Sequence, residues 1–350
     1  MRVVVTGATG NVGTSVVQAL AGDARVQEVV GLARRLPAWR SPKTTWAQAD
    51  VTSSLLSAYF RGADVVIHLA WAIQPSRDER TLHAVNVDGS RRVFQAAAEA
   101  GVGALVHASS VGAYSPGPKQ RRVDESWPTD GISTSFYSRH KAAVERILDE
   151  VQRDAPAMRV VRLRPGLIFK REAATGIRRL FLGPLIPTPL VRRGLIAFVP
   201  EMVRLRLQAV HSLDVGEAFR AAALGKARGA FNVAAEPVLD SEELSRVLSA
   251  RALPVAPGAL RAAASLSWRL RLQPTPPGWL DLALGVPLMD TSRAREILEW
   301  RPRHSASEAL VELLDGIRAG AGLSTPPLDP GTSGYLRARE LWTGLGRRSI

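Results

Sequence analysis

A glycine-rich turn directly after the first apolar segment is the feature that most constrains this chain. The segment Arg2–Val5 runs into Thr6-Gly7-Ala8-Thr9-Gly10-Asn11-Val12-Gly13, where a helical pattern begins. In a strand–turn–helix unit, the first glycine permits a tight turn, the second lets the backbone approach a pyrophosphate, and the third lets the helix pack closely on the strand. The start of the helix presents unpaired N–H groups to the phosphates. The turn therefore predicts a dinucleotide site; a plain strand–helix turn is the alternative, and it would not need three glycines.

Strand-like and helix-like patterns alternate after this turn. Apolar runs of a strand's length occur at Arg2–Thr6, Glu28–Ala33, Asp64–Ala70, Ala104–Ser109 and Arg159–Arg164. Helical patterns lie between them at Asn11–Ala21, Leu82–Ala100 and Phe136–Asp154. Continuous apolar strands that alternate with helices indicate a parallel sheet covered on both faces. We therefore predict an α/β fold, a Rossmann-type doubly wound parallel sheet, with a smaller, mixed C-terminal substrate domain.

The alternation breaks after Pro165, because prolines interrupt residues 170–207. Helical patterns return at Asp214–Leu224, after Asp240, and near Ser292–Glu299 and Ser305–Arg318, with a short strand-like segment at 230–233. These patterns predict a Rossmann domain over residues 1–169, to which 208–234 returns, and a substrate-binding domain over 170–207 and 235–320. Residues 321–350 are predicted to be a loose tail.

Composition and charge narrow the classes of partner. The chain has 350 residues and no cysteine, which excludes disulfides, thiolate metal sites and a cysteine nucleophile, and we predict no metal site. The net charge of +14 is shared equally between the two halves, and only five of the 46 basic residues are lysine. An even distribution favours compositional bias, and no nucleic-acid-binding motif is present, so we predict no nucleic-acid partner. Residues 159–206, with a net charge of +9, either bind an anionic substrate group or share the bias.

No targeting or membrane-spanning segment is visible. The N-terminus lacks a signal-peptide pattern, and the longest apolar run, Leu180 to Val191, contains three prolines. That run is shorter than the ~20 apolar residues a membrane-spanning helix needs. We therefore expect a cytoplasmic protein, although this stretch could contact a membrane surface. The sequence leaves the oligomeric state open, and a homodimer is compatible with it.

Tyr137 and Lys141 are four residues apart in a helical pattern, so they share one face of the helix. A phenol has a pKa near 10 and is a poor base at neutral pH. A neighbouring ammonium and a positively charged nicotinamide would stabilise the phenolate and lower that pKa. The pair therefore predicts a tyrosine that moves a proton on a substrate oxygen.

These motifs together resemble the extended branch of the short-chain dehydrogenase/reductase superfamily, the NAD-dependent epimerase/dehydratase family, over residues 1–320. The matching segments are Thr6–Gly13, Ala49-Asp50-Val51, His68-Leu69-Ala70, Asn86-Val87-Asp88-Gly89, Ser109-Ser110, Tyr137-x-x-x-Lys141 and Arg164-Pro165-Gly166. The resemblance implies that Ser110, Tyr137 and Lys141 are catalytic, with Ser110 on the reacting carbonyl and Lys141 also on ribose hydroxyls. The implied cofactor contacts are Gly7, Thr9, Gly10, Asn11, Val12, Gly13, Asp50, Val51, Leu69, Ala70, Trp71, Asn86, Ser109, Tyr137, Lys141, Pro165, Gly166 and Leu167.

The end of the second strand bears on the choice of cofactor. An NAD site has a carboxylate there, which binds the ribose 2′-hydroxyl. Here Ala33 stands at that position, and Arg34 and Arg35 follow. Two guanidinium groups favour the 2′-phosphate of NADP, so we expect NADP(H). NAD(H) is the alternative cofactor. The alternative interpretation of the two arginines is a solvated basic turn that contacts no cofactor.

Two departures from the family's pattern narrow the expected chemistry. Val111-Gly112-Ala113 replaces the Thr-Asp-Glu of the sugar-nucleotide dehydratases, and the segment after Arg164 lacks the asparagine that holds a diphosphate in many epimerases. We therefore expect an NAD(P)-dependent oxidoreductase for a secondary alcohol or ketone, on a small molecule with an apolar part and an anionic group. Arg178, Arg179 and His211 are the expected substrate-binding residues. For the segment that contains His211 and Asp214, the alternative to substrate contact is a helix cap formed by Asp214. A sugar-nucleotide epimerase and a non-catalytic cofactor-sensing regulator are the alternative functions, although such regulators typically lose the tyrosine and lysine.

Overall fold

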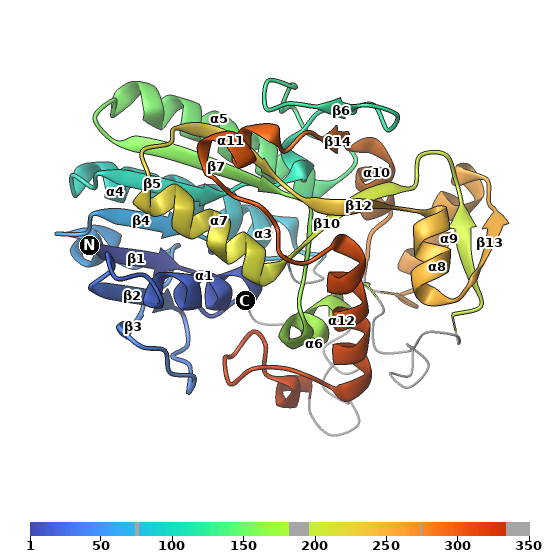
Figure 1. Ribbon diagram of the computed structural model, residues 1–350, viewed down its shortest axis with the longest axis horizontal. Coiled ribbons are helices and arrows are strands. Elements are labelled where there is room, and N and C mark those ends of the chain that lie inside the picture. Colours follow the sequence, from blue (N-terminus) through green and yellow to red (C-terminus); the bar gives the residue numbers. More distant parts are fainter. Residues whose placement is uncertain (74–76, 182–195, 274, 334–350) are drawn as a thin grey trace.

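A seven-stranded parallel sheet forms the centre of the molecule (Figure 1). The computed structural model describes residues 1–73, 77–181, 196–273 and 275–333. The sheet has the order β11-β7-β5-β4-β1-β2-β3, and every neighbouring pair in it is parallel. Its strands are β1 (Arg2–Thr6), β2 (Glu28–Ala33), β3 (Thr44–Gln48), β4 (Val65–His68), β5 (Ala104–Ala108), β7 (Arg159–Pro165) and β11 (Gly229–Val233).

Helices cover both faces of this sheet, which is why its central strands are apolar throughout. One face packs against α1 (Asn11–Ala21), α7 (Ser212–Leu224) and α11 (Ser292–Ile297). The other face packs against α2 (Leu56–Phe60), α4 (Gly89–Glu99) and α5 (Phe136–Asp154). Val3, Val4 and Val5 of β1 have no exposed surface. The doubly wound fold predicted from the alternation is confirmed.

The predicted elements differ from the observed ones mainly at the edge of the sheet. The sequence pattern did not predict β3 or α2. Strand β3 pairs only with β2, and its residues are half-buried or exposed, so it lacks a continuous apolar run. The helix predicted over Leu82–Ala100 starts earlier, as α3 (Glu79–His83), and reaches α4 through a π-helical turn over Ala84–Asp88.

A smaller unit packs beside the carboxyl ends of the parallel strands (Figure 1). Its three-stranded sheet has the order β12-β10-β8, from Ala235–Asp240, Arg206–His211 and Leu167–Phe169, and α12 (Ala306–Ala319) packs on it. The segment 208–234 therefore divides: β10 joins this small sheet, whereas α7 and β11 pack with the large one. The remaining elements are α6 (Ala174–Phe181), β9 (Phe198–Glu201), α8 (Ser241–Leu248), β13 (Arg251–Pro254), α9 (Pro257–Arg269), α10 (Gly278–Gly285), and the pair β6 (Arg122–Val123) and β14 (Leu288–Met289).

The segment after α12 is not loose where the structure describes it, so the prediction of a tail from residue 321 was wrong for 321–333. The Thr325 hydroxyl donates to the Thr9 carbonyl at 2.9 Å, and Leu328 is buried. The Ser324 carbonyl accepts from Trp39 N at 3.0 Å. A stretch rich in Gly, Ser, Thr and Pro is ordered here because it returns to the glycine-rich turn. Residues 334–350 lie outside the described part.

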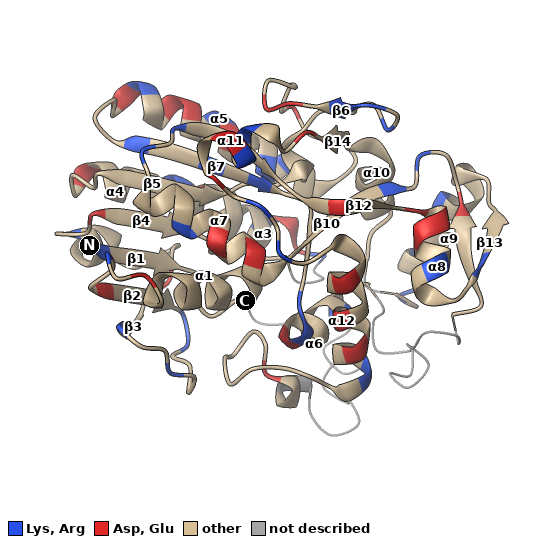
Figure 2. Ribbon diagram, in the orientation of Figure 1, with Lys and Arg blue, Asp and Glu red and all other residues tan. Residues whose placement is uncertain are grey.

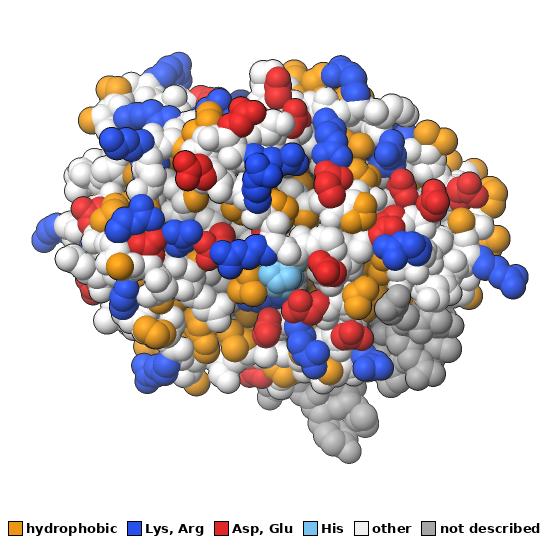
Figure 3. Space-filling model, viewed as in Figure 1, with side chains coloured by type: hydrophobic (Ala, Val, Ile, Leu, Met, Phe, Trp, Pro, Cys, Tyr) orange, Lys and Arg blue, Asp and Glu red, His pale blue; other side chains and the backbone are white. Residues whose placement is uncertain are grey.

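The surface carries both signs of charge, intermixed over the face drawn in Figure 3. That face shows no single basic patch, in keeping with the even distribution of charge along the chain. Within the described residues, no helix combines the length and the apolar character needed to cross a bilayer.

Candidate active site

A cavity of about 460 Å³ opens where β1 and β4 end, at the point in the sheet where the strand order changes direction. Ligands bind at this place in open α/β sheets. Most of the predicted site residues line it: Gly7, Thr9, Gly10, Asn11, Val12, Gly13, Arg34, Arg35, Asp50, Val51, Leu69, Ala70, Trp71, Ser109, Ser110, Tyr137, Lys141, Pro165, Gly166 and Leu167. One cavity therefore joins the glycine-rich turn to the Ser–Tyr–Lys set.

The glycine-rich turn is shaped as a phosphate cradle. Gly7 has a φ of +69°, and a Cβ there would lie 2.6 Å from Ala70 N. A Cβ on Gly13 would lie 2.3 Å from the Gly7 carbonyl oxygen, so α1 could not pack as it does on the turn. Helix α1 begins after Gly10 without a side-chain cap, which leaves its first N–H groups for an anion. The described residues thus fit a dinucleotide.

Two alanine substitutions in this turn should have separable effects. Gly13→Ala places a methyl group against backbone that cannot yield, so it should destabilise the fold by about 1–3 kcal/mol and abolish dinucleotide binding. Gly10→Ala meets only the Gly7 carbonyl oxygen, at 3.4 Å, so it should preserve the melting temperature and weaken binding through contact with the pyrophosphate. Thermal melts and dinucleotide titration check both. Equal melting temperatures for the two variants would contradict this account.

The end of β2 presents basic side chains to the cavity. Arg34 and Arg35 are exposed and line it, and Gln48 Nε2 donates to the Arg34 carbonyl at 3.1 Å. Asp50 also lines the cavity, but one of its carboxylate oxygens accepts from Thr52 N at 2.8 Å and from Thr52 Oγ1 at 2.7 Å. This carboxylate therefore shapes the turn that begins after β3.

The serine, tyrosine and lysine approach one another from two elements. Ser110 follows β5, is nearly buried, and its Oγ accepts from Gly112 N at 3.0 Å. Tyr137 and Lys141 lie on the first turns of α5. Ser138 holds these elements in register, because its hydroxyl donates to the Gly112 carbonyl at 2.5 Å. The sequence analysis did not identify Ser138, which has no signal beyond its place next to Tyr137.

Burial dominates the protonation of the tyrosine and lysine. It raises the pKa of Tyr137 to about 12, against the lowering effect of the Ser110 hydroxyl. The lowering of this pKa by Lys141 together with a bound nicotinamide stays a prediction. Burial also lowers the pKa of Lys141 to about 7. Its Nζ donates to the Ala108 carbonyl at 2.7 Å and lies 3.4 Å from the centre of the Trp71 ring.

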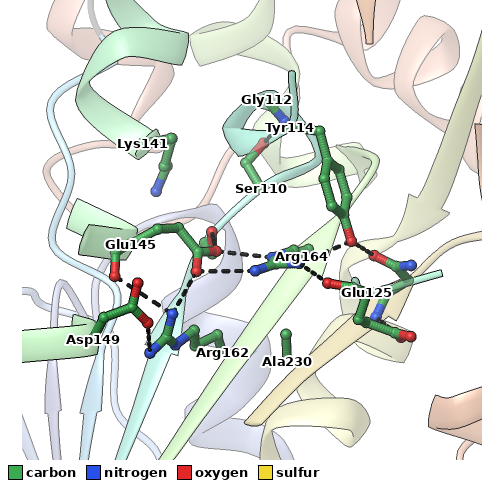
Figure 4. Close-up of polar contacts among 12 residues, drawn as sticks. Ser110, Gly112, Tyr114, Glu125, Lys141, Glu145, Asp149, Arg162, Arg164 and Ala230 are labelled. Atoms are coloured by element: carbon green, nitrogen blue, oxygen red, sulfur yellow. Dashed lines mark hydrogen bonds and ion pairs between the residues drawn. The ribbon is translucent and has the colours of Figure 1, made fainter. Parts of the chain in front are cut away.

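A buried carboxylate lies one helical turn beyond Lys141. Glu145 Oε1 accepts from the Ser109 hydroxyl at 2.5 Å and from Arg164 Nε at 2.9 Å, and its Oε2 accepts from Arg162 Nη1 at 2.9 Å (Figure 4). These donors hold the pKa of Glu145 at about 2 although burial raises it. Arg164 also reaches the Tyr114 hydroxyl at 3.0 Å. The network ties α5 to β5 and β7 directly beneath the Ser–Tyr–Lys set.

Sequence analysis did not identify the role of Glu145. Its signal was present, since it lies at i+4 from Lys141, and strand β7 carries Arg162 and Arg164 among apolar residues. The network also engages a predicted cofactor contact. The Ser109 hydroxyl donates its proton to Glu145, while Ser109 still lines the cavity, so its contact with cofactor stays a prediction.

Four further predicted site residues do not line the cavity. The Asn86 amide bonds both backbone groups of Ala72, accepting from N at 2.7 Å and donating to O at 3.0 Å, so it holds the chain after β4. Arg178 and Arg179 lie buried on α6 outside the cavity wall. His211 caps α7, since its Nδ1 accepts from Leu213 N at 3.2 Å. The last three are buried and lie outside the described lining of the cavity, so substrate contact by them stays a prediction without support from this geometry.

The smaller unit instead contributes an apolar wall. Its described lining residues in the two helices α6 and α10 carry no charge. They are Gly176, Ile177, Leu180 and Phe181 of α6, and Trp279 and Leu282 of α10. The Trp279 ring centre lies 5.0 Å from that of Tyr137 and 5.6 Å from that of Phe181. Pro326, Pro327 and Leu328 also line the cavity. None of these residues was predicted, because helices α6 and α10 and the returning segment meet only in the folded chain.

The fold and this site define a short-chain dehydrogenase/reductase of the extended type. Residues 3–179 match the NAD dependent epimerase/dehydratase family, and the chain belongs to that family.

Known proteins extend the comparison. An uncharacterized protein of Mycobacterium tuberculosis is 27% identical over 327 residues, which cover 92% of this chain and 31% of that protein. This chain thus spans about a third of that relative's length. The 4-hydroxy-2-methyl-3-oxo-4-farnesyl-3,4-dihydroquinoline-1-oxide ketoreductase of Stigmatella aurantiaca is 29% identical over 173 residues, 48% of this chain and 51% of that one.

Solved structures share the fold. The Thermus thermophilus UDP-glucose 4-epimerase complex with NAD superposes with a TM-score of 0.67 at 22% identity, over 91% of this chain and 99% of that one. The Bacillus cereus UDP-glucuronic acid 4-epimerase in complex with NAD gives a TM-score of 0.64 at 16% identity, over the same shares.

Proposed function

We propose that this chain is an NAD(P)-dependent oxidoreductase that interconverts a secondary alcohol and a ketone. The observation that carries the proposal is the cavity itself, in which the glycine cradle, Ser110, Tyr137 and Lys141 line one space. The family match and the ketoreductase relative support it. A regulator without catalysis is disfavoured, because both the tyrosine and the lysine are present.

The proposed roles follow from position and chemistry. The nicotinamide cofactor supplies or accepts a hydride at the substrate carbon. Tyr137 moves the proton on the attached oxygen, and Ser110 donates a hydrogen bond to that oxygen. Lys141 binds the cofactor's ribose and stabilises the phenolate form of Tyr137. The burial that raises the pKa of Tyr137 favours the protonated phenol, which is the form needed to reduce a ketone.

Cofactor preference is the next prediction. Arg34 and Arg35 lie exposed on the cavity wall directly after Ala33, which stands where an NAD site would have a carboxylate, so NADPH should bind more tightly than NADH. Loss of a charged hydrogen bond costs about 1.5–3 kcal/mol, so Arg34→Ala/Arg35→Ala should weaken NADPH binding at least tenfold and leave NADH binding nearly unchanged. Fluorescence titration of both cofactors checks this. Equal affinities in the unaltered chain would refute the preference.

We further propose that the substrate's body is apolar. The described wall from α6 and α10 offers aromatic and aliphatic surface, whereas a sugar diphosphate would need cations or hydrogen-bond donors there. The expected anionic group loses its support, since Arg178 and Arg179 lie outside the wall. The name of the Stigmatella relative includes a farnesyl group, which is apolar like the substrate body proposed here.

A direct assay separates this function from its rival, a sugar-nucleotide epimerase. NADPH consumption should be followed with 2-decalone, an apolar cyclic ketone, and UDP-glucose should be incubated with the chain in parallel. We expect oxidation of NADPH with the ketone and no change in UDP-glucose. Formation of UDP-galactose without net oxidation of cofactor, by protein that retains cofactor through purification, would establish the epimerase instead.

A further inference from the structure

Helix α9 turns an apolar stripe outward. None of its residues is buried, and its exposed positions Ala259, Ala262, Ala263, Leu266 and Leu270 follow one another at helical spacing. Leu266 and Leu270 are 59% and 60% exposed. A surface helix ordinarily presents polar residues to water and apolar residues to the core, so this arrangement is the reverse of the usual one.

Other apolar side chains of the same lobe are also exposed. Leu272 follows α9 and is 52% exposed. Leu253 of β13 and Phe198 of β9, on paired strands of the same lobe, are 47% and 54% exposed. Contiguous exposed apolar surface on a folded protein marks a site of interaction.

The charges around the stripe are positive. Residues 244–280 contain five arginines and no carboxylate. Arg246 and Arg261 pair with Glu243 and Asp281, whereas Arg269 and Arg271 are exposed and have no acidic partner among the described residues. The acidic residues of this lobe lie off α9, on α8 and at the end of β9, where Glu201 is exposed (Figure 2). A partner with an anionic surface and an apolar interior would therefore complement both the arginines and the apolar side chains of the stripe.

The end of α9 and the segment after it contact elements next to the cavity. The Arg77 guanidinium lies 4.2 Å from the Trp268 ring and donates to the Trp268 carbonyl. Thr275 donates to the carbonyl of Leu180, which lines the cavity wall. The end of α9 is thus linked to the cavity wall through one hydrogen bond.

From these observations we propose that α9 docks the protein on an anionic lipid bilayer, with Leu266, Leu270 and Leu272 inserted at the interface and Arg269 and Arg271 on the headgroups. Amphipathic helices with this combination of apolar and basic residues bind bilayer surfaces. A second copy of the chain is a poorer occupant. A twofold contact along this stripe would bring the same unpaired arginines face to face. The docking itself does not depend on the proposed function; supply of an apolar substrate from the bilayer does.

Vesicle sedimentation tests the docking. The full chain should sediment with vesicles of phosphatidylcholine and phosphatidylglycerol, and little with phosphatidylcholine alone. About 1 kcal/mol of attraction per basic residue implies that Arg269→Gln/Arg271→Gln lowers partitioning about 30-fold. Leu266→Gln/Leu270→Gln should lower it about tenfold or more.

A matched control and a second measurement keep the test decisive. Leu36→Gln/Leu55→Gln replaces two leucines that are 54% and 74% exposed elsewhere, and it should sediment as the unaltered chain does. Thermal melts identify any variant that fails to fold. Absence of sedimentation with anionic vesicles would overturn the proposal. A dimer in sedimentation velocity that Leu266→Gln/Leu270→Gln dissociates would assign the stripe to self-association instead. Because these readouts measure no catalysis, they stand or fall separately from the proposed function.

Discussion

Tyr137→Phe should lower turnover at least 100-fold while leaving the fold and cofactor affinity close to those of the unaltered chain. The substitution removes one oxygen and keeps the ring that packs 5.0 Å from Trp279. General acid–base catalysis contributes about 10²–10⁴-fold to rate, and Tyr137 is the group placed to supply it. Turnover of a ketone with NADPH, cofactor titration and a thermal melt provide the three measurements.

The same change at another tyrosine is the control. Tyr59 is also a hydrogen-bonded tyrosine, with its hydroxyl 2.9 Å from the Gln48 carbonyl, but it does not line the cavity. Tyr59→Phe should retain full turnover. Lys141→Ala should differ from Tyr137→Phe by also weakening cofactor binding, since the lysine has two proposed roles. Activity of Tyr137→Phe within a few-fold of the unaltered chain would remove the main support for the oxidoreductase proposal.

Glu145→Gln should destabilise the fold by about 3–5 kcal/mol, the cost of removing one partner of a buried ion pair. Its carboxylate is 1% exposed and receives hydrogen bonds from Arg162, Arg164 and Ser109. A neutral amide would leave the buried Arg164 guanidinium without its anion, and Arg162 with only the exposed Asp149, at 2.7 Å. Denaturant unfolding measures the change, and a large fall in melting temperature is expected.

An exposed glutamate on the same helix gives the comparison. Glu150 pairs with Arg91 at 3.1 Å, and both side chains are 46% exposed. Glu150→Gln should cost no more than about 1 kcal/mol, because water already solvates both charges. Similar losses for the two variants would show that the Glu145 network adds little.

Acid should act on the same network. The folded-state pKa of Glu145 is held at about 2, below the 4.5 that is ordinary for a glutamate carboxyl. A depressed pKa contributes stability that is present above about pH 4.5 and is lost as the pH falls towards 2. Glu145→Gln lacks this ionisation, so its stability should fall less steeply over that interval.

Much of the fold could be predicted from local patterns. The bounds predicted for β1, β2, α1 and α5 agree with the structure, because continuous apolar runs and helical periodicity are properties of neighbouring residues. Strand β3 was missed because it lies at the sheet edge and lacks an apolar run. The segment around Leu328 was misjudged because composition does not reveal which distant surface a flexible stretch will cover.

The sequence by itself determined the glycine-rich phosphate cradle and the placement of Tyr137 and Lys141 on one face of a helix. Glycine spacing limits where backbone can pack closely, and four residues make one turn of a helix, so both features depend only on near neighbours. The tertiary structure alone decided which side chains share the cavity. Ser110 reaches Tyr137 only because β5 and α5 pack together, and Glu145 is buried only because β7 brings two arginines beneath it. It likewise turned Arg178 and Arg179 away from the cavity and brought Trp279 in, since burial depends on contacts between residues far apart in the chain.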